Sequence, residues 1–145
     1  MSNTLPEFRE KFRLDDLTIL TSTHWTWSVR PVHSTLGAGI LCLNRFCANF
    51  GGMTQDESAD LSVIVNEIET KLTKSFAPEK FNYVMLMMVD RHLHFHVIPR
   101  YSAPKQFGGL TWEDQGWPAL PQLGAYADLA TNSVLGEIRS MLANA

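Results

Sequence analysis

Three of the five histidines in this chain lie close together at alternate positions, His92, His94 and His96. The residues between them, Leu93 and Phe95, are apolar. Because successive side chains of a β-strand point to opposite faces of a sheet, this alternation predicts a strand with imidazoles on one face and apolar side chains on the other. A lone histidine on such a strand is usually a core residue, whereas three on one face indicate a site that carries out chemistry.

A metal site is one use for such a row, but its geometry is unfavourable. Same-face neighbours on a strand are roughly 6.6 Å apart, so the Cα atoms of His92 and His96 are roughly 13 Å apart. Zinc needs ligand nitrogens about 2.0–2.1 Å from one point. Two adjacent histidines can meet that demand, but no nearby cysteine or acidic run offers a further ligand. We expect no metal, and we keep a metal-dependent enzyme that uses two of the histidines as an alternative.

A row of imidazoles is better suited to an extended anionic substrate. Neutral imidazole is a nucleophile near pH 7, and protonated neighbours can donate hydrogen bonds to phosphoryl oxygens. Since crowded positive charges disfavour protonation of all three rings, one ring can stay neutral without a dedicated base. His94 has a helper on each side and is the candidate nucleophile. Its attack on phosphorus would give a phosphohistidine-type intermediate, which water or another acceptor then resolves.

The segment from His92 to Arg100, HLHFHVIPR, resembles the signature of the histidine triad (HIT) family of nucleotidyl hydrolases and transferases. The resemblance implies an α+β fold, usually a homodimer, that cleaves nucleotides at the α-phosphate through a nucleotidylated histidine. It also implies that His94 is the nucleophile, and that His92 and His96 orient it and bind the phosphate or the leaving group. The mechanism of this family needs no metal, and we expect no cofactor.

Four further residues are candidates for substrate binding: Arg30, His33, Asn82 and Arg91. Arg30 ends a segment, WSVR, that resembles the strand lining the nucleoside pocket of HIT domains, and His33 lies in the loop that borders the phosphates. Asn82 lies ten residues before His92 and is followed by a tyrosine. The same Asn-Tyr pair is found at this place in a bacterial subgroup that resembles diadenosine polyphosphate hydrolases. A solvated charge or structural pair is the alternative for Arg30, and a strand-start residue for Asn82.

The main departures from the family pattern are Met87 and Met88. HIT chains usually carry a small residue and then Gln, Asn or Ser there, and a methionine donates no hydrogen bond to a phosphate. Loss of one transition-state donor typically costs on the order of a hundredfold to a thousandfold in rate. Arg91, where proline is common, is a candidate replacement cation, and Phe46 stands where many members have histidine. A nucleotide-binding module with weak or no catalysis is therefore an alternative function.

The elements that must position these residues follow from hydrophobic spacing. With the histidine strand they predict an antiparallel sheet of about five strands, crossed by one long helix and joined by a short C-terminal helix. The long helix opens with a capping box at Thr54 and ends before Pro78. Its acidic residues, Glu57 among them, are expected to be a solvated face and first-turn charges rather than catalytic carboxylates. We expect a helix at Leu5–Phe12, apolar residues from Leu14 to Leu20 that lead into a first strand, and strands at His24–Pro31, Gly39–Leu43 and Phe81–Val89. The last of these strands is expected to join the histidine strand by a hairpin turn, and a final helix is expected to start near Thr131-Asn132.

Length and composition predict one HIT domain over residues 1–145, with its core at about 10–120 and a C-terminal loop and helix at 101–145. The chain is 45% hydrophobic and 19% charged, which is ordinary for a globular protein. A net charge of −3 gives no electrostatic reason to expect a nucleic-acid partner.

No stretch approaches twenty apolar residues, and Met1–Leu20 lacks the apolar core of a signal peptide. Cys42 and Cys47 are too few for a disulfide framework. We therefore expect a cytoplasmic protein without a membrane partner. The resemblance implies a nucleotide substrate, with a dinucleoside polyphosphate such as diadenosine tetraphosphate first among the candidates.

Overall fold

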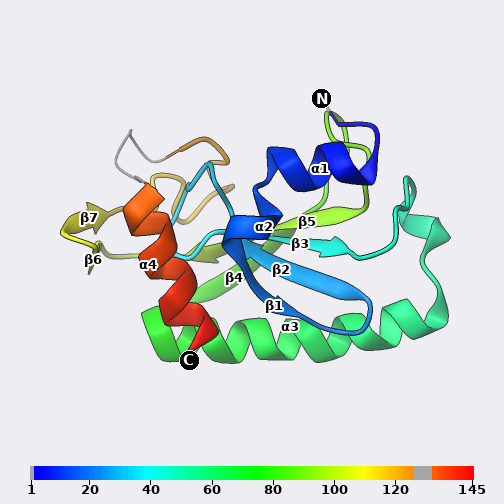
Figure 1. Cartoon of the computed structure of the whole chain (residues 1–145). Coiled ribbons are helices and arrows are strands. Elements are labelled where there is room, and N and C mark those ends of the chain that lie inside the picture. Colours follow the sequence, from blue (N-terminus) through cyan, green and yellow to red (C-terminus); the bar gives the residue numbers. More distant parts are fainter. Residues whose placement is uncertain (1, 126–131) are drawn as a thin grey trace.

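A computed structural model of the chain describes residues 2–125 and 132–145. A five-stranded antiparallel sheet lies between the long helix α3 on one face and the N-terminal helix α1 on the other (Figure 1). The strand order is β1-β2-β3-β5-β4, and β6 and β7 form a separate antiparallel pair. This architecture confirms the predicted α+β class. The bounds are α1 Leu5–Lys11, α2 Leu14–Leu17, β1 Thr18–Thr21, β2 Trp25–Val29, β3 Gly39–Leu43, a 3-10 turn at Phe50–Gly52, α3 Gln55–Phe76, β4 Lys80–Val84, β5 His94–Arg100, β6 Lys105–Phe107, β7 Leu110–Trp112 and α4 Asn132–Ala143.

Helix α3 supports the sheet from the side opposite the histidines. It begins with the predicted capping box, in which the Thr54 hydroxyl accepts from the Glu57 N–H and the Glu57 carboxylate accepts from the Thr54 N–H. It ends at Phe76 and is capped by Ala77, whose φ of 49° is left-handed, directly before Pro78. Its buried side chains join the sheet in one core: Ile64, Ile68, Leu72 and Phe76.

The two faces of β5 differ as the alternation predicts. Leu93 and Val97 belong to the core beneath α3, while His94 and His96 are paired in register with Cys42 and Ile40 of β3 on the other face. That second face is covered by helix α1 and the residues after it, whose aromatic side chains pack on β3. The resulting smaller cluster consists of Phe8, Phe12, Leu14, Ile40 and Cys42.

The connection between β4 and β5 differs from the predicted strand through Val89 and its hairpin turn. Strand β4 ends at Val84 instead of continuing to Val89, and β5 begins at His94, so His92 precedes the strand. Met87 has a φ of 53°, a left-handed conformation that a bulky residue rarely adopts and that interrupts an extended run. Residues 85–93 therefore form a loop rather than a hairpin turn. The loop is fixed by Asp90, which forms an isolated bridge with Ser2.

The start and the end of the chain both pack on the sheet. Leu14–Leu17 is a short helix where the sequence predicted the approach to a strand, and β1 starts only at Thr18. Helix α4 contacts α3 and β1, with Leu135, Ile138 and Leu142 buried. Within residues 2–125 and 132–145, no helix has the length and apolar character needed to cross a bilayer.

Candidate active site

One hydrogen bond determines the state of the His94 ring, at the start of β5. Its Nδ1 lies 2.6 Å from the carbonyl oxygen of His92. A carbonyl only accepts, so Nδ1 carries the hydrogen and the lone pair of the neutral ring is on Nε2. Phe8 and His96 contact the ring, with centroid separations of 5.0 and 5.1 Å. Burial lowers the pKa of His94 below its ordinary value of 6.5, which favours this neutral, nucleophilic form.

The His94 ring is only 2% exposed, but it borders a cavity. The cavity has a volume of about 350 Å³, near the lower end for small-molecule sites. His94 and His96 form one part of its wall, and charged and apolar side chains form the rest. These further residues are Lys11, Phe12, Arg30, Pro31, Val32, Leu86, Met87, Met88, Val89, Asp90 and Leu123.

His96 brings an unsatisfied polar atom to this cavity. Its Nδ1 is buried and has no hydrogen-bond partner in the described part of the chain. Burial, reinforced by the positive charge of Arg30, lowers the pKa of His96 to about 4, so the ring is neutral at pH 7. An unpaired buried nitrogen is costly unless a ligand or water satisfies it. His96 is therefore a neutral imidazole in the cavity wall beside His94, with one buried ring nitrogen unpaired.

His92 serves the site through its backbone. Its Nε2–H donates to the Leu43 carbonyl at 2.6 Å, and its Nδ1 accepts from the Cys47 N–H at 3.2 Å. The Phe46 ring stacks on it, with centroids 5.5 Å apart. With both nitrogens engaged and no contact with the cavity, the His92 side chain does not lie where it would bind a phosphate. Its carbonyl oxygen orients His94.

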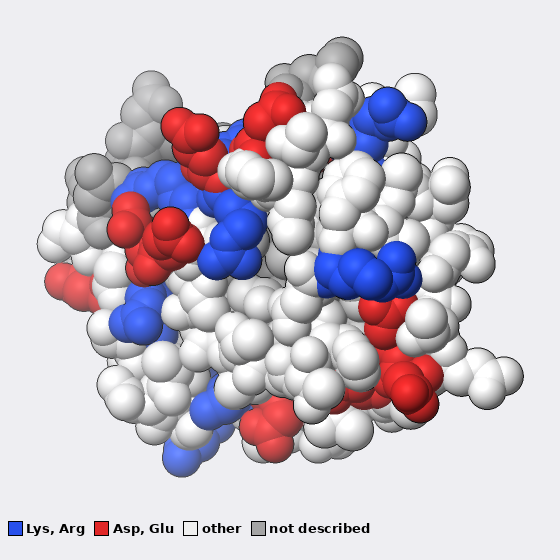
Figure 2. Space-filling view, turned by 45° about the vertical axis from the view of Figure 1, so that its right-hand side comes forward, with Lys and Arg blue, Asp and Glu red and all other residues white. Residues whose placement is uncertain are grey.

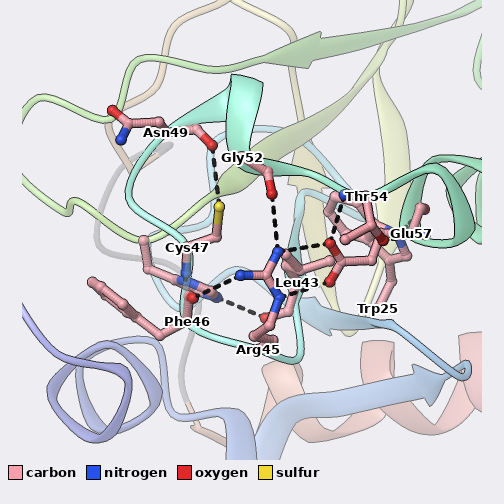
Figure 3. Close-up of polar contacts among 10 residues, drawn as sticks. Trp25, Leu43, Arg45, Phe46, Cys47, Asn49, Gly52, Thr54 and Glu57 are labelled. Atoms are coloured by element: carbon pink, nitrogen blue, oxygen red, sulfur yellow. Dashed lines mark hydrogen bonds and ion pairs between the residues drawn. The ribbon is translucent and has the colours of Figure 1, made fainter.

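The loop that holds His92 is anchored to helix α3 by an ion pair (Figure 3). Arg45 donates to the two carboxylate oxygens of Glu57 at 2.7 and 3.1 Å and to the Gly52 carbonyl at 3.1 Å. The Arg45 hydrogen bonds, together with those from Thr54, lower the pKa of Glu57 to about 2. Glu57 is a first-turn charge, as expected, but it is 3% exposed and so does not lie on a solvated face. The capping box and Arg45 account for the contacts of its carboxylate, and its backbone carbonyl accepts from the Trp25 Nε1–H at 2.8 Å.

Arg30 is a buried cation in the cavity wall. Its Nη1 donates to the carbonyls of Val32, at 2.8 Å, and Leu123, while its Nε has no partner in the described part of the chain. Among residues 2–125 and 132–145, no carboxylate forms an ion pair with it. Burial lowers its pKa to about 10, which still leaves it charged. A buried charge without a counter-ion favours an anionic ligand.

Lys11 and Asp90 form a second charged part of the wall. The Lys11 Nζ donates to the two Asp90 oxygens at 2.9 and 2.7 Å, and Asp90 also accepts from the N–H and hydroxyl of Ser2, at 3.1 and 2.7 Å. Sequence reasoning missed both members of the pair, because 79 residues separate them and neither belongs to a local pattern. The one local signal for this pair in the sequence is that Asp90 lies two residues before His92.

The other candidates for substrate binding are not brought to this cavity. His33 is buried elsewhere, where its Nδ1–H donates to the Arg30 carbonyl and its Nε2 accepts from the Gly37 N–H. Asn82 accepts from Arg100 at 2.7 Å and lines a separate hollow beside Trp117. Arg91 is exposed and does not line the cavity. Of the four, the structure places only Arg30 with His94 and His96.

The two methionines that depart from the family pattern lie in the cavity wall. Met88 is 81% exposed, and its neighbours Leu86 and Val89 are also exposed. The wall from Leu86 to Val89 therefore offers no side-chain hydrogen-bond donor to a ligand. Across the part of the chain that the structure describes, no three or more His, Cys, Asp or Glu side chains are grouped to hold a metal ion.

Comparison with known proteins relates the chain to one family. Residues 40–103 match the model of the HIT domain. An uncharacterised HIT-like protein of Mycoplasma genitalium is 27% identical over 77 residues, which cover 50% of this chain and 55% of the relative. The match thus spans about half of that relative.

Solved structures show the same fold. A hypothetical histidine triad nucleotide-binding protein of Sulfolobus tokodaii has a TM-score of 0.68 at 12% identity, covering 94% of this chain and 87% of the other. A histidine triad protein of Sinorhizobium meliloti has a TM-score of 0.64 at 20% identity, with 93% of each chain covered. The diadenosine triphosphate hydrolase of Plasmodium falciparum has a TM-score of 0.64 at 13% identity, covering 89% of this chain and 75% of the other.

Proposed function

We propose that this chain is a histidine triad (HIT) protein and that it is a nucleotide hydrolase or transferase acting at an α-phosphate, because residues 40–103 match the model of the HIT domain. The substrate is a nucleoside polyphosphate or phosphoramidate. One observation carries the proposal: the hydrogen bond from His94 Nδ1 to the His92 carbonyl leaves the Nε2 lone pair of a neutral ring beside a cavity.

The chemistry proceeds by double displacement. His94 Nε2 forms a bond to phosphorus while the bond from phosphorus to the leaving oxygen or nitrogen breaks, and water or another acceptor then cleaves the Nε2–P bond. The imidazole of His96 hydrogen-bonds the leaving atom and relays a solvent proton to it. Arg30 offsets the charge of the phosphoryl oxygens. Each step depends on in-line positioning and charge neutralisation more than on a strong base.

A dinucleoside polyphosphate such as diadenosine tetraphosphate is the first substrate to test. The similarity in fold to the diadenosine triphosphate hydrolase supports it at the level of architecture alone. A cytoplasmic location and a homodimer, both expected from the sequence, are part of the proposal.

The alternative function is a nucleotide-binding module with little catalysis. Its specific support is the apolar wall that includes Met87 and Met88, which provides no hydrogen-bond donor where the family usually has one. A second alternative is a metal-dependent enzyme that uses two of the histidines. Activity that persists after exhaustive chelation would argue against the metal-dependent enzyme.

The deciding experiment traps the covalent intermediate. The protein is mixed with a panel of adenylyl and guanylyl substrates, quenched in denaturant and weighed intact by mass spectrometry. We expect a nucleotidylated protein with wild type and none with His94→Gly. The His24→Gly variant, which changes a histidine outside the cavity, should form the adduct normally. Nucleotide binding without an adduct or turnover in wild type would favour the binding module.

A further inference from the structure

We propose that Lys11 of helix α1 is a phosphate-binding residue of this cavity, held there by its ion pair with Asp90. The inference rests on the proposed function, because it assigns a contact for the phosphate that His94 attacks. It concerns a residue from the opposite end of the sequence, on a helix that the histidine motif does not include.

The supply of hydrogen-bond donors in the cavity points to Lys11. Among the lining residues, only Lys11, Arg30, His94 and His96 have a side-chain N–H group, and none has a hydroxyl. His94 is committed to the bond with phosphorus. Arg30 is partly committed, because its Nη1 donates to two backbone carbonyls. Lys11 is therefore a main source of charged donors for a phosphate.

The ion pair positions the Lys11 ammonium group but does not use all of its hydrogen-bond donors. An ammonium group has three donors, and the two Asp90 oxygens account for two of them at 2.9 and 2.7 Å. Asp90 is fixed independently by Ser2, so the carboxylate stays in place when a ligand arrives. The Lys11 side chain is 40% exposed, which gives it room to turn towards a ligand. Its charge also lowers the pKa values of both His94 and His96 and is thus close enough to act on them.

On the face shown in Figure 2, surface charge offers no other broad site for an anion. The face shown in Figure 2 has basic and acidic side chains interspersed among large uncharged areas, without a broad basic patch. Both cavity histidines have pKa values lowered by burial, so the fixed positive charges in the wall are Lys11 and Arg30. Lys11 is therefore one of the two cations, with Arg30, that can attract a phosphate to the cavity.

The test compares nucleotides with their nucleosides by calorimetry. AMP, GMP, CMP and UMP are titrated into wild type, and the tightest binder and its nucleoside are then titrated into each variant. Lys11→Met should weaken the monophosphate by about tenfold or more, because charge-assisted hydrogen bonds are the stronger ones. The affinity for the nucleoside should stay the same. Arg9→Met, which removes a positive charge from the same helix outside the cavity, should leave both affinities unchanged.

A double variant separates direct contact from net charge. Lys11→Met/Asp90→Asn keeps the net charge of the cavity and avoids an unpaired buried carboxylate, so it also guards against loss of folding. It should bind the monophosphate as weakly as Lys11→Met does. Wild-type affinity in either variant would overturn the role of Lys11, while the His94 adduct would leave the proposed function intact. If no monophosphate binds wild type, the inference fails; if no adduct forms either, the proposed function fails with it.

Discussion

At the scale of single residues, burial and one hydrogen bond prepare His94 without a dedicated base. The His92 carbonyl fixes which nitrogen carries the hydrogen, and the surrounding Phe8 and Phe12 rings exclude water from one side. The same burial keeps His96 neutral. A site built in this way offers neutral imidazoles at pH 7 and takes its positive charge from Lys11 and Arg30.

This arrangement predicts the pH dependence of the reaction. His94 and His96 have pKa values below 6.5, that of His96 about 4, so the neutral form of both rings predominates at pH 7. The value of kcat/KM should stay level from about pH 8 to about pH 7 and fall with a midpoint below pH 6.5, with apparent constants that belong to the pair. Fixed-time activity assays across this pH range measure kcat/KM. A fall centred at pH 6.5 or above would contradict the buried, neutral pair.

The residues of the site differ in how far the sequence reveals them. The alternation of His92, His94 and His96 predicts their shared face, because strand periodicity is local. The pair Lys11–Asp90 has no such signal, since two side chains 79 residues apart meet only through the packing of α1 on the sheet. His33 was a candidate on its position in a loop, but burial and two backbone partners make it part of the turn.

At the scale of elements, a buried ion pair attaches the segment after β7 to the sheet. Arg100, at the end of β5, donates through Nε and Nη2 to Asp114 at 2.7 and 3.3 Å, and through Nη2 to the Ala119 carbonyl at 2.9 Å. Asp114 also accepts from the Tyr101 N–H at 3.1 Å. This segment continues to Leu123, whose carbonyl accepts from Arg30 in the cavity wall. The ion pair thus supports one border of the cavity from a distance.

Breaking this pair should destabilise the fold. Asp114→Ala leaves the guanidinium of Arg100 buried without its counter-ion, and we expect a loss of roughly 3–5 kcal/mol in the free energy of unfolding. Arg100→Met/Asp114→Leu removes both charges and should cost less than the single change. Urea unfolding at pH 7 gives both values. The exposed pair Arg9–Asp15 is the control, where Asp15→Ala should change stability by less than about 1 kcal/mol. A loss below about 1 kcal/mol for Asp114→Ala would contradict the structural role.

The elements with strong periodicity were predictable and the loops were not. The capping box at Thr54 and the apolar spacing of α3 are local signals, and the helix follows them. The apolar run after Phe81 predicted a strand through Val89, but β4 ends at Val84 and Met87 turns left-handed. The cause is that Asp90 accepts hydrogen bonds from Lys11 and Ser2, which hold the loop beside the N-terminal segment. No pattern within the loop encodes a contact with α1.

At the scale of the whole molecule, the two edges of the sheet differ. Strand β1 is covered by α4, and Arg139 of that helix donates to the Thr18 carbonyl at 2.9 Å. Strand β4 has no further strand on its outer side within residues 2–125 and 132–145. An exposed strand edge presents unpaired backbone groups that favour pairing with another chain. The predicted homodimer therefore has one edge available for a continuous sheet, and two chains can meet there by a two-fold axis.

We accordingly expect two chains to associate through β4. Light scattering after gel filtration should give twice the 16.3 kDa mass of one chain. Val84→Arg places a bulky charge on this edge in both chains, so the like charges should weaken the dimer and make its mass depend on concentration. Thr21→Arg adds the same charge to the exposed end of β1 and should leave the dimer intact. A monomer at every concentration would contradict association, and dissociation by Thr21→Arg alone would assign the interface to the β1 edge.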